Sequence, residues 1–165
     1  MERRLKKETY KLLTLKLKRY QELKEDIFEI EEESSCNNNG FDINSSIRGN
    51  STSDKVGRIA IKLADNKQYN EYKAWKDCID ELYLSYARGG DYVKSEFIRR
   101  RYIIKKLKNF EIPYNISLKD NHVIMDLELE GINYSARTWK YWKSEIVYQF
   151  YLIAKRKNLI KSDEN

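Results

Sequence analysis

Residues 135–158 read SARTWKYWKSEIVYQFYLIAKRKN, and two stripes within this stretch decide the expected fold. Apolar side chains recur at spacings of three and four, the period of one face of an α-helix, at Trp139, Trp142, Ile146, Phe150 and Ile153. A second stripe with the same period lies on another side, at Arg137, Lys140, Tyr141 and Ser144. The stretch therefore predicts one long helix with a buried face and a basic, polar face.

The residues just before this helix predict a shorter helix and a turn. We expect a helix from Ser117 to Glu130 and a break at residues 131–133, which include Gly131. A helix, a glycine-containing turn and a second helix form the skeleton of a helix-turn-helix. The acidic residues near the end of the first helix should keep it away from a DNA backbone; they are Asp126, Glu128 and Glu130.

A basic helix is predicted upstream of this pair. Asp91 is suited to begin it, and it should stop before Ile112, because the residue that precedes Pro113 is pushed out of the helical conformation. Its apolar positions alternate with a cluster of cations, namely Arg99, Arg100, Arg101, Lys105, Lys106 and Lys108. These cations are candidates to hold phosphates.

The first half of the chain predicts a helical arm, a linker and a central helical layer. Residues 1–33 lack proline and glycine and repeat apolar residues at helical spacing, which predicts one long helix, the N-terminal arm. Residues 34–52 are rich in Asn, Ser and Gly and predict a flexible linker. Residues 53–90 predict two helices, the first capped at Ser53 and Asp54 and the second ended by Gly89 and Gly90.

Composition favours an all-α fold. The chain has 165 residues with one proline and six glycines, which suits amphipathic helices and supplies few of the turns that an all-β fold needs. The net charge is +6, and its distribution is uneven: residues 91–161 carry 15 Lys or Arg against 8 Asp or Glu, whereas residues 1–90 carry 17 against 16. A positive field over the C-terminal part of the chain (residues 91–158, the expected DNA-binding domain) favours a polyanionic partner.

No enzyme, metal site or cofactor site is predicted. Cys36, Cys78 and His122 share no metal-ligand spacing, and His122 has no nucleophile and carboxylate arranged as a triad. The chain has no signal-peptide core and no run of about 18 apolar residues, so we expect a cytoplasmic protein without a membrane contact.

The basic stripe of the last helix favours contact with double-stranded DNA. Donors near the start of a recognition helix reach base edges in the major groove, and Arg137 leads the base-reading set of Arg137, Lys140, Tyr141 and Ser144. The phosphate-binding set adds Lys143, Lys155 and Arg156 to the cations of residues 99–108. Both stripes also fit a solvated helix surface, and Lys155 and Arg156 equally suit a helix C-terminus.

Three segments resemble one protein family. Residues 134–146, YSARTWKYWKSEI, are similar to the end of the RinA and ArpU group of phage transcriptional activators, in which a small residue and Arg-Thr precede an aromatic, a basic and a second aromatic residue. Residues 53–56, SDKV, resemble the start of that family's second helix. Residues 97–102, FIRRRY, resemble its Phe-Ile-x-x-Arg-Tyr stretch.

The resemblance implies an activator of phage late packaging or lysis genes, acting in a bacterial host through a domain similar to region 4 of sigma factors. It implies Arg137, Lys140, Tyr141 and Ser144 as the recognition positions, double-stranded DNA and host RNA polymerase as partners, and leaves a homodimer through the N-terminal arm open. This chain departs from the family in one place. It carries extra residues between Gly131-Ile132 and Arg137-Thr138, which predicts a longer turn.

Two alternatives of other classes remain. A DNA-packaging protein resembling a small terminase subunit would also join a helix-turn-helix to long helices, but it should form rings. A helical interaction module would use the arm and the aromatic layer to bind another protein and would make no DNA contact.

Overall fold

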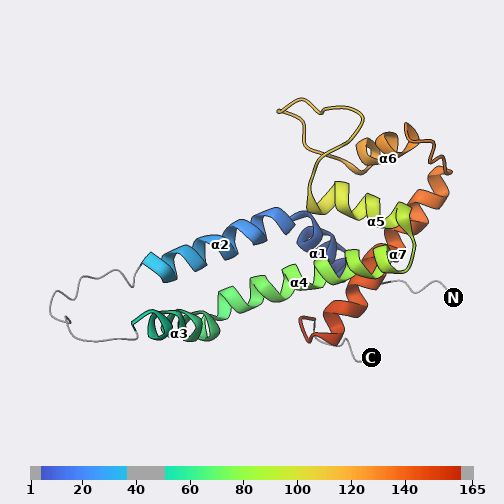
Figure 1. The fold of residues 1–165 in the computed structure, drawn as a ribbon. Coiled ribbons are helices and arrows are strands. Elements are labelled where there is room, and N and C mark those ends of the chain that lie inside the picture. Colours follow the sequence, from blue (N-terminus) through green and yellow to red (C-terminus); the bar gives the residue numbers. More distant parts are fainter. Residues whose placement is uncertain (1–4, 37–50, 161–165) are drawn as a thin grey trace.

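The computed structural model describes residues 5–36 and 51–160, and every regular element in these ranges is helical. The expected all-α class is confirmed. Figure 1 shows the arrangement: two helical segments extend side by side to one end of the molecule, and shorter helices gather at the other end. Within the described residues, no helix is long and apolar enough to span a bilayer.

The N-terminal arm consists of two helices, so the prediction of one helix over residues 1–33 was wrong. Helix α1 (Lys7–Lys18) ends at Arg19, whose N–H is shared between the carbonyls of Leu15 and Lys16 at 3.1 and 3.2 Å, and α2 begins at Tyr20 (Tyr20–Cys36). The apolar repeat continues through this break, because Leu17 and Tyr20 are both buried. Residues 1–4 lie outside the described part.

The arm packs on the rest of its own chain. Helix α2 runs antiparallel to α4 (Lys67–Arg88), as Figure 1 shows, and two tyrosines tie them together. The Tyr20 hydroxyl donates to Asp80 at 2.6 Å, and the Tyr69 hydroxyl donates to Glu31 at 2.8 Å. Helix α1 packs against the last helix of the chain.

The central layer begins earlier than expected. Helix α3 (Ser51–Asp65) starts two residues before Ser53, and α2 includes residues 34–36, so both ends of the predicted linker are helical. Residues 37–50 lie outside the described part. The two helices expected over residues 53–90 are separated at Asn66, whose side chain caps α4 by accepting from the Tyr69 N–H. The end of α4 at Gly89 is also confirmed, and Gly90 has a left-handed backbone with φ of 76°.

The basic helix is much shorter than predicted. Helix α5 (Tyr92–Ile98) begins at Asp91 as expected and continues into a π-helical turn, η1 (Arg99–Ile103), which ends nine residues before Ile112. The Ile104 N–H donates to the Arg99 carbonyl at 2.8 Å, and the Gln21 side chain donates to the Ile103 carbonyl. The basic helix therefore ends beside α2, and Pro113 lies within the loop that follows.

Helices α6 (Asp120–Glu128) and α7 (Ala136–Arg156) occupy the place of the predicted helix pair. Both are shorter than the expected ranges of 117–130 and 135–158. Gly131, with φ of 85°, turns the chain between them, and the connection from Leu129 to Ser135 is longer than the three or four residues usual in a helix-turn-helix.

One hydrophobic core joins most of these helices. It draws on α1, α2, α4, α5, α6 and α7, and includes Leu13, Trp75, Phe97, Val123 and Phe150. The rings of Trp75 and Phe150 lie 5.9 Å apart between centroids, so the centre of α4 meets the centre of α7. The arm is thus part of the same packed body as α7.

Candidate nucleic-acid interface

The start of α7 is fixed by two local contacts. The Ser135 hydroxyl accepts the Thr138 N–H at 3.1 Å, which satisfies one of the free donors at the helix start. The Tyr134 ring packs edge-on against Trp139 and Trp142, at centroid distances of 6.0 and 4.6 Å. Tyr134 stands just before the cap residue, and Trp139 is five residues later. An apolar contact between these two positions is a hydrophobic staple, which sets the direction in which the chain enters the helix.

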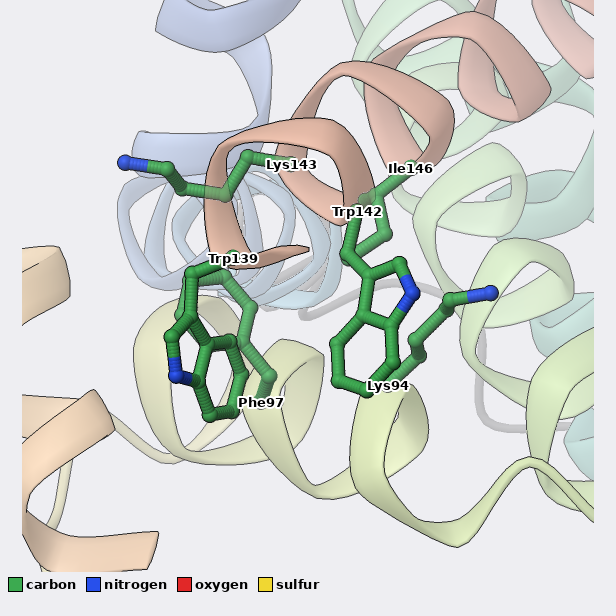
Figure 2. Close-up of a pocket in the computed structure, with 6 residues that line it drawn as sticks. All are labelled: Lys94, Phe97, Trp139, Trp142, Lys143 and Ile146. Carbon is green, nitrogen blue, oxygen red and sulfur yellow. The ribbon is translucent and has the colours of Figure 1, made fainter. Parts of the chain in front are cut away.

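The inner face of α7 is tightly packed against α5. Figure 2 shows Trp139 above Phe97 and Trp142 beside Lys94, and the side chains leave no room for a water molecule. Trp139 and Trp142 meet edge to face at 5.3 Å, and Phe97 lies 6.1 Å from Trp139. The predicted burial of the Trp139, Ile146, Phe150 and Ile153 face is confirmed, with Trp142 half-buried.

The outer face of α7 carries the predicted base-reading stripe. Arg137, Lys140, Tyr141 and Ser144 are all exposed, and Tyr141 retains 65% of its accessible surface. Among the described residues, neither Arg137 nor Lys140 forms an ion pair. The Ser144 hydroxyl donates to the Lys140 carbonyl at 3.1 Å. The stripe thus offers two cationic side chains whose donors are free to meet a ligand.

Ion pairs flank this stripe. The Lys143 ammonium lies 3.3 Å from Asp120 of α6, and Glu145 lies 3.0 Å from the Lys94 ammonium of α5. Burial alone would raise the pKa of Asp120, but Arg101 and Lys143 outweigh it and lower that pKa. Burial alone would lower the pKa of Lys94, but the Asp91 and Glu145 carboxylates outweigh it and raise that pKa. Asp120 and Lys94 are therefore charged at neutral pH.

Arg100 belongs to the interior, so its prediction as a phosphate ligand was wrong. Its side chain is 1% exposed, and its guanidinium contacts Asp126 at 2.6 Å, Glu130 at 2.8 Å and Glu96 at 3.1 Å. Burial alone would raise the pKa of Asp126, but the N–H groups of Lys108 and Asn109 together with Arg100 lower it. Asp126 of α6, together with Glu96 and Glu130, therefore neutralises a cation of the same chain.

Arg101 and Arg99 are also committed to partners. Arg101 is buried and its Nε donates to Asp120 at 2.6 Å, so its predicted phosphate contact was wrong as well. Arg99 is half-buried and forms two bonds of 2.7 Å to the carboxylate of Glu96. Two successive arginines of η1 thus hold opposite ends of α6, Arg101 at Asp120 and Arg100 at Asp126.

The three lysines predicted on the basic helix lie instead in the loop that follows it. Lys105, Lys106 and Lys108 are exposed, and Lys105 has a left-handed backbone with φ of 48°. Asp126 accepts the N–H groups of Lys108 and Asn109 at 2.9 and 2.7 Å, which holds the loop on α6. Lys108 is 3.7 Å from Glu130. Lys105 and Lys106 make no ion pair with the described residues.

The last two predicted phosphate ligands lie at the far end of α7. Lys155 is exposed, while Arg156 pairs with Glu81 of α4, which also lies 3.3 Å from Lys157. Eighteen residues separate Lys155 from Arg137, which corresponds to roughly 27 Å along the helix axis. These residues are therefore not brought together with the stripe at the start of α7.

The sequence alone did not indicate the ion pairs that organise this region. Asp120, Asp126 and Glu145 carry no motif, and their partners are distant in sequence, so spacing could not pair them. His122 is half-buried, and its Nδ1 accepts the Lys119 N–H at 3.2 Å. Within the described ranges, no group of three or more His, Cys, Asp or Glu side chains is placed to hold a metal ion.

Comparison with known proteins does not assign a function to this site. No family model matches the chain, and no curated protein and no solved structure matches it either.

Proposed function

We propose that this chain is a sequence-specific DNA-binding transcriptional regulator that activates phage late genes for packaging or lysis. The observation that carries DNA binding is the outer face of α7, where Arg137, Lys140, Tyr141 and Ser144 are exposed on a helix held firmly by its aromatic face. Most other cations nearby are neutralised within the chain, whereas Arg137 and Lys140 meet no carboxylate among the described residues.

In this proposal the first turns of α7 enter the major groove. The Arg137 guanidinium presents paired donors that suit the O6 and N7 acceptors of guanine, and Lys140 adds a second donor one turn later. The Tyr141 ring offers an apolar contact and a hydroxyl. Lys105 and Lys106 of the loop beside α6 supply phosphate contacts, which carry no sequence information but fix the position of the protein on DNA.

The roles in phage late transcription rest on the resemblance of residues 134–146 and 97–102 to the RinA and ArpU group. The same resemblance is the basis for proposing host RNA polymerase as a partner and α6 and α7 as a helix-turn-helix. A single recognition helix buries a modest surface on DNA, so a second copy or the polymerase would raise the affinity.

A gel-shift titration at two salt concentrations tests DNA binding. The probes are the duplex upstream of the neighbouring operon and a scrambled duplex of equal length. We expect retention that weakens steeply with salt, because phosphate contacts release counterions, and a preference for the upstream duplex. Arg137→Ala should lose most of that preference, by about tenfold, whereas the control Arg88→Ala, at the exposed end of α4, should keep it. Binding of neither duplex would exclude the proposal.

A second candidate is a helical interaction module, which two exposed aliphatic side chains of α3 favour. Val56 and Ile61 keep 65% and 64% of their accessible surface, although both are large aliphatic residues. Large apolar side chains that stay exposed are available for contact with another protein. Light scattering together with the gel shift separates the possibilities. A monomer or dimer that binds DNA fits a regulator, and a ring-sized species fits a packaging protein. A protein that retains no DNA in the gel shift fits the interaction module.

A further inference from the structure

The proposed contact depends on how α7 is rotated about its own axis. A helix with side chains has a radius of about 5–6 Å, so a rotation of about 20° would move the tips of its side chains by roughly 2 Å. That displacement exceeds the narrow range of distances over which a hydrogen bond forms. The aromatic packing of α7 acts on one side of the helix, so contacts on its two flanks are suited to limit the remaining rotation.

One flank of α7 is tied to α5. The Lys94 side chain is only 10% exposed, and its ammonium lies 3.0 Å from Glu145 of α7 and 3.0 Å from Asp91, the residue that caps α5. It also lies 5.4 Å from the centroid of the Trp142 ring and 5.5 Å from that of Tyr86. Glu145 therefore meets a cation that α5 holds in place.

The other flank is tied to α6. Asp120, the first residue of α6, receives the Arg101 Nε donor on one oxygen at 2.6 Å and the Lys143 ammonium on the other at 3.3 Å. Lys143 and Glu145 are two residues apart, which places them about 200° apart around the helix. Figure 2 shows the result: Lys143 extends on one side of the two tryptophans, and Lys94 lies on the other side.

We propose that Asp120 and Glu145 are positioning residues of the DNA interface, which fix the rotation of α7 by holding its two flanks to α6 and α5. This inference rests on the proposed function. The stripe of Arg137, Lys140, Tyr141 and Ser144 lies on the side of α7 opposite the tryptophans, so both ties act on the direction in which the stripe points. Neither carboxylate touches DNA.

Removing either carboxylate should change DNA affinity in a direction that distinguishes a positioning role from a purely electrostatic one. Loss of a negative charge beside the interface should strengthen binding to every DNA sequence, because repulsion from phosphates falls. Loss of a positioning contact should instead weaken binding to the preferred sequence alone. The ratio of the two affinities therefore distinguishes the two effects.

The variants Asp120→Asn and Glu145→Gln test the proposal with little disturbance of the fold. An asparagine at position 120 still offers an oxygen to the Arg101 Nε, and the Asp120–Lys143 pair, with both side chains 31% exposed, contributes little to stability. Glu128→Gln is the matched control, since it removes an exposed carboxylate from α6 that has no ion pair with the described residues. Asp120→Glu restores the charge and serves as the rescue.

The experiment begins with selection of duplexes from a random library by the wild-type protein, full length. Each variant is then titrated against the best selected duplex and a scrambled duplex, with a thermal melt to verify folding. We expect Asp120→Asn and Glu145→Gln to lower the ratio of specific to non-specific affinity about tenfold, with unchanged or tighter non-specific binding. Glu128→Gln should leave the ratio unchanged, and Asp120→Glu should recover it.

Two outcomes would overturn different statements. If the wild type selects no sequence and retains no duplex, the proposed function fails. If the wild type selects a sequence but Asp120→Asn and Glu145→Gln behave like Glu128→Gln, the positioning role fails while DNA binding stands. A melt that shows an unfolded Glu145→Gln variant leaves Asp120→Asn and its rescue to decide.

Discussion

At the scale of single residues, charge in the C-terminal part of the chain divides into internal pairs and free cations. Arg100 and Arg101 are buried and neutralised, whereas Arg137 and Lys140 are exposed. The net positive charge counted along the sequence is therefore larger than the number of cations that are exposed and available to DNA phosphates would suggest. The free cations lie on α7 and in the loop after η1, and these places define the candidate interface.

Replacing the buried arginine should destabilise the fold strongly. Arg100→Leu would leave Asp126, Glu96 and Glu130 without their shared cation, and such a loss in the interior costs about 3–5 kcal/mol. Urea denaturation followed by circular dichroism measures the change. The control Lys106→Leu, at an exposed loop position, should stay within about 0.5 kcal/mol. Equal stabilities of the two variants would contradict the role of Arg100.

The same cluster predicts acid sensitivity. The pKa of Asp126 and that of Glu96 are lower in the folded chain than in an unfolded one. A lowered pKa stabilises the fold above the unfolded value, near 4, and that stabilisation is lost as pH falls further. The free energy of unfolding should therefore be flat near neutral pH and decrease below about pH 5. In Arg100→Leu this decrease should be shallower, and an identical slope in both proteins would argue against the cluster as its source.

At the scale of elements, the start of α7 shows how local sequence fixes a helix boundary. Ser135 caps the helix, Tyr134 staples it, and Gly131 supplies the left-handed turn before it. These devices lie within eight residues of one another. The end of η1 is different, because Gln21 of α2 and Asp126 of α6 hold the chain there from far away in sequence.

Removal of the cap should weaken the fold by about 1 kcal/mol. Ser135→Ala deletes the acceptor for the Thr138 N–H, and hydrogen exchange at Thr138 should become faster along with the loss of stability seen in urea. Ser117→Ala, which changes an exposed loop residue, provides the comparison and should be nearly neutral. Unaltered exchange at Thr138 in Ser135→Ala would show that the cap does not hold this end of α7.

At the scale of the whole molecule, the arm and the candidate interface share one core. Leu13 and Leu17 of α1 are fully buried in the cluster that contains Phe150 and Ile153 of α7. The arm therefore stabilises the core on which α7 packs, and loss of the buried leucines of α1 should destabilise α7 as well.

Two leucines of α1 test this coupling. Leu17→Ala should cost about 2–5 kcal/mol, since Leu17 is fully buried, while Leu15→Ala, at a residue 53% exposed in the same helix, should cost less than about 1 kcal/mol. The readout is thermal unfolding followed by tryptophan fluorescence, which reports Trp75, Trp139 and Trp142. A fluorescence transition in Leu17→Ala at the wild-type temperature would mean that the arm unfolds separately.

Periodicity and local signals determined much of this fold. The all-α class, the buried face of α7, the break at Asn66, the end of α4 at Gly89 and the turn at Gly131 follow from residues within one or two turns of each other. The exposure of Arg137 and Lys140 follows in the same way, because a stripe opposite a buried face must point outward. The role of these two residues in DNA binding stays a prediction.

Only the tertiary structure decided where long-range pairs form. The burial of Arg100 depends on its pair with Asp126, and the Ile103 carbonyl, at the early end of the basic helix, meets Gln21; the partners in both pairs lie far apart in the chain. A sequence does not show whether a charged side chain will face solvent or the interior. An arginine in a basic run looks the same whether it faces solvent or a buried carboxylate, and the packing of α6 against η1 made that choice for Arg100.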